Sequence, residues 1–249
     1  MACFAGLLLN NALGGVIAEN MGWEYLFYLY GGAATLWAAV WLWYFDDTPQ
    51  QSKRITGEEL DYIEATTMIS AERPKLSETP FLAIFTNVGF LALLFAATTG
   101  TIQAYVIADY MPKYLLDVHN YDLANAGFAS SMPYLFQFIT GLVCCLSVDI
   151  VVQKQFMSLT WLRKSAGLMA LMPSAIVFSL INVVGCNTDI VIAFLSISCA
   201  FAGLAGASFS PNYVDIAPKY AGLLHGLCDT FQSAGGFMVP LAVGAIIKG

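Results

Sequence analysis

The sequence has few charged residues and only two histidines. Charged residues make up 11% of its 249 positions, and Lys and Arg together number ten. Because a soluble domain of this length needs a largely polar surface, the shortage argues against a soluble fold. So few basic residues also argue against nucleic-acid binding.

Motifs for catalysis and metal binding are missing as well. The sequence contains no HExxH, P-loop, G-x-S-x-G or paired catalytic carboxylates, so we expect the protein not to be an enzyme. None of its six cysteines forms a CxxC or a Cys/His spacing typical of a metal site. We therefore expect no metal and no bound cofactor.

Long apolar segments dominate what remains. Hydrophobic residues make up 58% of the chain, and the mean hydropathy is +0.69. A transmembrane helix needs about 20 mostly apolar residues. Seven stretches meet that requirement: 2–18, 25–45, 84–111, 123–148, 165–184, 190–211 and 220–247. The sequence therefore predicts an all-α membrane protein with about seven spans.

The basic residues predict how these spans are oriented. Eight of the ten lie in the connections after the second, fourth and sixth spans, which share one side of the membrane. Only Lys113 and Lys248 lie on the opposite side. Cytoplasmic connections carry an excess of Lys and Arg, so we expect a cytoplasmic N-terminus. Seven-helix receptors have an external N-terminus, and this orientation argues against that class.

The connection 46–80 is the clearest boundary in the chain. Thr56 and Glu59 match a capping box, which predicts a short helix over 57–68; a solvated linker is the alternative. Two predicted spans precede this connection and five follow it.

Several motifs occur in a specific order and spacing. They include Gly22-Trp23, Asp47-Thr-Pro49, and the sequence Asn212-Tyr-Val-Asp215-Ile-Ala-Pro218. In this respect the chain resembles the family of sialin, vesicular glutamate transporters and type I sodium-phosphate cotransporters. The resemblance covers essentially the whole chain and implies a major facilitator superfamily fold, which has twelve helices in two halves.

Counted against that fold, the chain resembles helices five to eleven. Residues 1–45 would then be the last two helices of the N-terminal half, and residues 46–80 the cytoplasmic loop between the halves. Residues 81–249 would be the C-terminal half without its last helix. We therefore expect a partial fold, a fragment with about seven of twelve helices.

The resemblance also implies a function in the lipid bilayer. It implies symport of a small anionic solute, an organic anion or phosphate, with H⁺ or Na⁺ as the coupling ion. The alternative is a truncated, transport-incompetent membrane protein that associates with or regulates a full-length relative. A plasma membrane and an endolysosomal or vesicle membrane both fit.

The last span carries a polar stripe. His225, Asp229 and Gln232 follow one another at helical spacing on an otherwise apolar segment. Ionisable residues within a span are costly unless they are paired or face water. We expect His225 and Asp229 to form a proton-coupling pair that lines the aqueous pathway, with a locally satisfied pair as the alternative. Gln232 is a candidate for the substrate pathway.

Three further polar residues are candidates for that pathway. Tyr105 lies in the third predicted span, and Tyr134 and Gln137 lie in the fourth. Their hydroxyl and amide groups could hydrogen-bond a polar substrate. Packing of the aromatic rings in the core is the alternative.

The family motif itself is expected to be structural. Asn212, Asp215 and Pro218 lie at the predicted cytoplasmic end of the sixth span, where capping, a turn and a charge pair would fit. We expect Asp215 to pair with Lys219 or with another base on the inner face. Asp149 is the aspartate retained in the loop after the fourth span.

Overall fold

The computed structural model describes residues 2–52, 54–66, 79–184 and 187–248, and every regular element among them is helical. The helices are α1 (Ala2–Asn20), α2 (Glu24–Tyr44), α3 (Gly57–Thr66), α4 (Phe81–Thr86), α5 (Val88–Asp117), α6 (Leu123–Gln153), α7 (Leu159–Val184), α8 (Thr188–Ala202), α9 (Ala205–Ile216) and α10 (Ala221–Lys248). Two 3₁₀ turns, Pro49–Gln51 and Pro218–Tyr220, lie between them. The all-α prediction is confirmed.

All seven predicted spans fall on helices. Five helical segments in the described residues are long and apolar enough to cross a membrane: Glu24–Tyr44, Val88–Asp117, Leu123–Gln153, Leu159–Ile181 and Thr188–Ile216. The first and last predicted spans, on α1 and α10, are not among them. For those two helices the membrane crossing stays a prediction.

The sixth predicted span is broken in the structure into α8 and α9. The break follows Gly203, which closes α8 by donating its N–H to the carbonyl of Cys199 at 3.0 Å. A Cβ atom at Gly203 would collide with the Thr140 hydroxyl and lie 2.7 Å from the Gln137 carbonyl oxygen, both on α6. Glycine therefore lets α6 and the α8–α9 junction approach closely.

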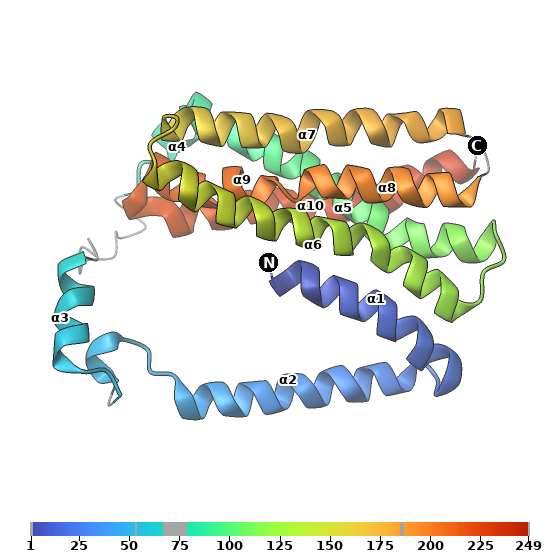
Figure 1. Ribbon diagram of the computed structural model, residues 1–249, viewed down its shortest axis with the longest axis horizontal. Coiled ribbons are helices and arrows are strands. Elements are labelled where there is room, and N and C mark those ends of the chain that lie inside the picture. The colour runs from blue at the N-terminus through green and yellow to red at the C-terminus, as the bar shows by residue number, and fades with distance from the viewer. Residues whose placement is uncertain (1, 53, 67–78, 185–186, 249) are drawn as a thin grey trace.

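Helices α5 to α10 form one bundle of roughly parallel and antiparallel rods (Figure 1). One apolar cluster joins α5, α6 and α8 and includes Ile107, Tyr134 and Leu195. A second joins the start of α5 to α9 and α10 and includes Phe90 and Leu224. The bundle thus has one apolar cluster near each of its ends. The part of the bundle between these clusters can hold polar residues.

Helix α1 packs against α6 at a pair of glycines. A Cβ atom on Gly15 would lie 3.2 Å from the Cα of Gly127, so neither position has room for a side chain. One turn later, the Glu19 carboxylate accepts a hydrogen bond of 2.6 Å from the backbone N–H of Ala124. That N–H belongs to the first turn of α6, where a negative charge is favourable. Glu19 thus caps a helix other than its own.

Helix α2 differs from the bundle. It turns back from α1 through Gly22, whose φ of +103° favours glycine, and no residue of α2 is buried. Figure 1 shows it running beside α1 and apart from α6.

The capping box is present on α3, where the Glu59 N–H donates to the Thr56 hydroxyl at 3.4 Å. Residues 67 and 68 of that predicted helix lie outside the described residues.

Candidate functional site

Two residues of the predicted polar stripe on α10 are in direct contact. Nδ1 of His225 lies 2.8 Å from Oδ2 of Asp229, one helical turn away, and the two side chains are 50% and 56% exposed. The buried residues of α10, Leu224 and Cys228 among them, lie on the neighbouring face that packs into the bundle. The pair therefore lies at the open side of the bundle.

This stripe continues from α10 to α5 through Gln232. Its side-chain amide donates to Oδ1 of Asp229 at 3.4 Å, and its carbonyl oxygen accepts from the Thr101 hydroxyl at 2.7 Å. His225, Asp229, Gln232 and Thr101 thus form a continuous series of polar contacts across two helices. We call these four residues the polar ladder.

One aromatic ring supports the outer end of the polar ladder. The ring of Tyr213, on α9, lies 4.8 Å from the imidazole of His225, centroid to centroid, at an angle of 57°. Tyr213 is buried, whereas His225 is half-exposed. The contact limits the imidazole to one side of its helix. A carboxylate and an imidazole in contact can share a proton, and the amide and hydroxyl beyond them can bind a polar group.

Tyr134 and Gln137 lie on α6, away from the polar ladder, whereas Tyr105 lies one turn beyond Thr101 on α5. The ring of Tyr105 packs against Gly236 at the crossing of α5 and α10, where a Cβ atom would lie 3.2 Å from Cζ. Tyr134 is 3% exposed in the cluster with Ile107 and Leu195, and its hydroxyl has no partner in the described residues. Tyr134 therefore occupies a core-packing position. The backbone carbonyl oxygen of Gln137 lies against Gly203, at the junction of α8 and α9.

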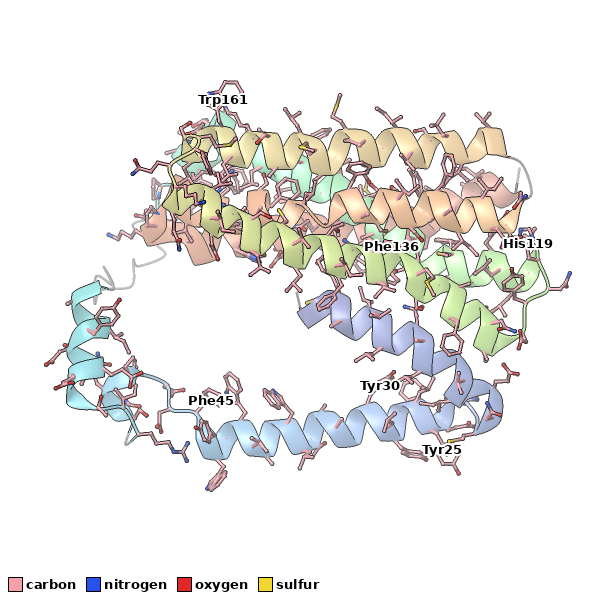
Figure 2. The ribbon with its side chains drawn as sticks, viewed as in Figure 1. Tyr25, Tyr30, Phe45, His119, Phe136 and Trp161 are labelled. Carbon is pink, nitrogen blue, oxygen red and sulfur yellow. The ribbon has the colours of Figure 1, made fainter. Side chains whose placement is uncertain are left out.

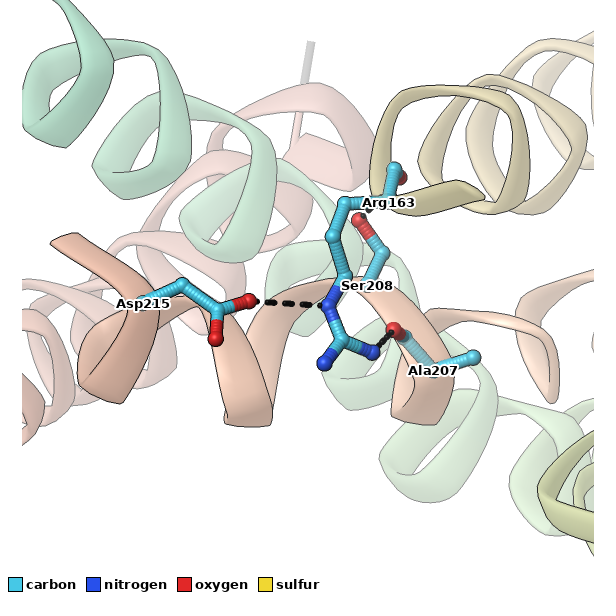
Figure 3. Close-up of polar contacts among 4 residues, drawn as sticks. All are labelled: Arg163, Ala207, Ser208 and Asp215. Atoms are coloured by element: carbon cyan, nitrogen blue, oxygen red, sulfur yellow. Dashed lines mark hydrogen bonds and ion pairs between the residues drawn. The ribbon is translucent and has the colours of Figure 1, made fainter. Parts of the chain in front are cut away.

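The family motif belongs to a second polar site, which runs along α9 (Figure 3). Nε of Arg163 lies 3.0 Å from Oδ2 of Asp215, and Nη1 donates to the carbonyl oxygen of Ala207 at 2.6 Å. Ser208 donates from its hydroxyl to the carbonyl of Arg163 at 2.8 Å. These contacts join the first turns of α7 to the whole length of α9.

Asp215 pairs with Arg163, one of the bases predicted on the same inner face, and the ammonium of Lys219, the other candidate, lies 5.9 Å from the ring of Tyr220. One detail of the predicted motif is corrected. Asp149 is not in a loop, because α6 continues past it to Gln153. Asn212 lies beside Arg163, and Pro218 begins the 3₁₀ turn before α10.

One buried polar cluster was missed from the sequence. Gln103 on α5 donates to the hydroxyls of Ser174 on α7 and Ser198 on α8 at 2.8 and 2.7 Å, and both serines are fully buried. The two hydroxyls also lie 2.9 Å apart. A glutamine in the middle of an apolar span was the available signal. The cluster ties three helices together.

The comparisons with known proteins agree with this architecture. The family model of the Major Facilitator Superfamily matches residues 1–240. The chain is 30% identical to human sialin over 95% of its own length and 47% of that protein. It is 30% identical to vesicular glutamate transporter 2 of Mus musculus over 98% of its length and 42% of that protein.

An uncharacterized transporter of Caenorhabditis elegans is also 30% identical, over 95% of this chain and 50% of that protein. The chain thus spans about half the length of the curated relatives it matches. The similarity to sialin and the vesicular glutamate transporters confirms the resemblance seen in the motifs. The helical spans and the match over residues 1–240 show that the chain belongs to the major facilitator superfamily.

Proposed function

We propose that the chain is a segment of a secondary active transporter that carries a small anion, organic or phosphate, by symport with H⁺ or Na⁺. The observation that carries this proposal is the similarity, over nearly the whole chain, to proteins named as sialin and as a vesicular glutamate transporter. We further propose a cytoplasmic N-terminus, which the distribution of Lys and Arg in the sequence supports.

The polar ladder is the part of the structure best suited to coupling. His225 and Asp229 are in contact and half-exposed, so a proton and water can reach them. Alternating access requires a polar site that faces an aqueous pathway between helices. Gln232 and Thr101 extend the ladder towards α5 and would offer hydrogen bonds to an anion or to bound water.

The test is uptake in proteoliposomes that contain this chain alone. Labelled glutamate and labelled phosphate are offered in turn, under an imposed pH gradient or Na⁺ gradient. We expect a gradient-driven flux of one anion and expect Asp229→Asn to remove its pH dependence. Asp109→Asn is the control, since Asp109 is an exposed acid on α5 outside the ladder. An unchanged pH dependence in Asp229→Asn would contradict the coupling role.

One observation favours the alternative of a transport-incompetent partner protein. Helix α2 has an apolar surface with no buried residue, and its main contact with another helix is with α1. Such a surface could associate with a full-length relative in the membrane. No flux from the chain alone, together with co-purification with full-length sialin and a changed flux through it, would support this alternative over the first.

A further inference from the structure

A groove runs along the outside of the bundle between α5 and α7. It encloses about 730 Å³, which lies within the usual range for ligand pockets. We call it the α5–α7 groove. Small residues of α5 form one wall and larger apolar residues of α7 form the other: Gly89, Ala92 and Ala96, and Leu168, Leu171 and Met172.

The floor of the groove is held closed by α9. A Cβ atom on Gly167 would lie 2.8 Å from the Ser208 hydroxyl, so α7 and α9 are in direct contact there. The Ser208 hydroxyl is already used, because it donates to the Arg163 carbonyl. The groove is therefore open on its outer side, towards the surroundings of the bundle, and not into the core.

The polar end of the groove carries one positive charge. Arg163 and Asp215 both line this end, but they neutralise each other in their ion pair. Lys164 lines it too and is exposed, with neither a hydrogen bond nor an ion pair in the part of the chain that the structure describes. An anion at this end would thus meet an uncompensated ammonium group.

An exposed tryptophan beside this charge is typical of the membrane surface. Trp161, one turn before Lys164 on α7, is 69% exposed, and Figure 2 shows it pointing away from the bundle. Tryptophan is enriched at the boundary between lipid headgroups and hydrocarbon. From Lys164 to Met172 the helix rises about 12 Å, at ~1.5 Å per residue. The groove therefore runs from headgroup depth into the hydrocarbon.

We propose that the α5–α7 groove binds an anionic phospholipid, with the phosphate at Lys164 and one acyl chain along Leu168 and Met172. Basic pockets between transmembrane helices on the cytoplasmic side are suited to anionic headgroups. A soluble anion would use Lys164 and leave the long apolar wall without a ligand. A protein helix would fill the wall and leave the ammonium without a counter-charge. A phospholipid satisfies both ends.

The experiment measures which lipids the chain retains. The chain is reconstituted in nanodiscs of phosphatidylcholine with a minor fraction of phosphatidylglycerol, extracted into detergent, and analysed by native mass spectrometry. We expect one phosphatidylglycerol to stay bound. We expect Lys164→Gln to reduce its retention about fivefold, which corresponds to one lysine near an anionic surface. Ala92→Phe, which fills the groove, should reduce retention of any lipid there.

Two matched variants serve as controls. Lys154→Gln removes a lysine from the end of α6, outside the groove, and Ala104→Phe enlarges an exposed alanine of α5 that does not line it. Neither should change retention. Equal loss in Lys154→Gln and Lys164→Gln, or full retention in Ala92→Phe, would overturn the proposal. Release of the lipid by inorganic phosphate alone would show a soluble-anion site and overturn it as well.

Discussion

Two charge pairs in this chain differ in their exposure and in the number of helices that they join. Arg163 and Asp215 join α7 to α9, with side chains that are 14% and 31% exposed, and the guanidinium also binds a backbone carbonyl. His225 and Asp229 lie one turn apart on α10 alone and are half-exposed. The first pair holds two helices in place. The second joins two residues of a single helix.

This difference predicts unequal contributions to stability. A charge pair that joins two helices and is only partly exposed is costly to break, because each partner is left without its counter-charge. An exposed pair within one helix contributes little to stability. The two pairs can therefore be distinguished by experiment.

The largest effect is expected for Arg163→Ala. The substitution leaves Asp215 and the Ala207 carbonyl without their donor, and hydrogen bonds to charged groups contribute about 2 kcal/mol. Unfolding of the detergent-solubilised chain by a graded increase in SDS measures the loss. Lys164→Ala is the control, because this neighbouring lysine is unpaired and its removal should cost less than ~0.5 kcal/mol. Equal stabilities for the two variants would contradict the structural role.

Removal of a neutral hydrogen bond between helices tests whether the loss of stability depends on charge or on the position of the contact between helices. Gln103→Leu removes the hydrogen bonds to Ser174 and Ser198, and inter-helix hydrogen bonds in membrane proteins contribute about 1 kcal/mol. The same SDS titration should give a loss between those of the two α7 variants. A loss as large as that of Arg163→Ala would show that inter-helix position alone determines the effect.

A smaller loss is expected within the polar ladder. Thr101→Val keeps the shape of the side chain and removes its hydrogen bond to Gln232, which contributes about 0.6 kcal/mol on average at such sites. Thr99→Val is the matched control, since its hydroxyl bonds only to the Phe95 carbonyl of its own helix. No difference between the two variants would mean that the ladder does not link α5 to α10.

The smallest effect is expected for the pair on α10. A double-mutant cycle with His225→Ala and Asp229→Ala should give a coupling energy of at most about 0.5 kcal/mol, as for exposed pairs one helical turn apart. The equivalent cycle for Arg163 and Asp215 should give a larger coupling energy, because that pair is less exposed and joins two helices. Equal couplings would remove the distinction between the pairs.

The sequence predicts those features that depend on neighbours along the chain. Apolar runs of about 20 residues locate each long helix, because a helix satisfies its backbone hydrogen bonds by itself. The contact between His225 and Asp229 follows from helical spacing, since residues four apart share a face. The capping box at Thr56 is local in the same way.

Contacts between helices could not be predicted from the sequence in the same way. The partner of Asp215 lies 52 residues earlier, and the sequence left the choice open between Lys219 and another base on the inner face. Whether Tyr134 faced a pathway or the core depended on how α6 is turned towards α5 and α8. The cluster around Gln103 needs three helices to be aligned. None of these arrangements can be read from one segment, because each depends on the rotation of a helix about its own axis.

The contact between Glu19 and Ala124 has a consequence for the biogenesis of the chain. The two residues are separated by 105 positions, so α1 leaves the ribosome well before its partner α6 exists. At synthesis rates of about 5–20 residues per second, the wait lasts on the order of 5–20 s. During that interval the glycine face of α1 and the carboxylate of Glu19 must be accommodated by lipid, water or the insertion machinery. The contact between α1 and α6 can therefore form only after the N-terminus of α6 has been delivered.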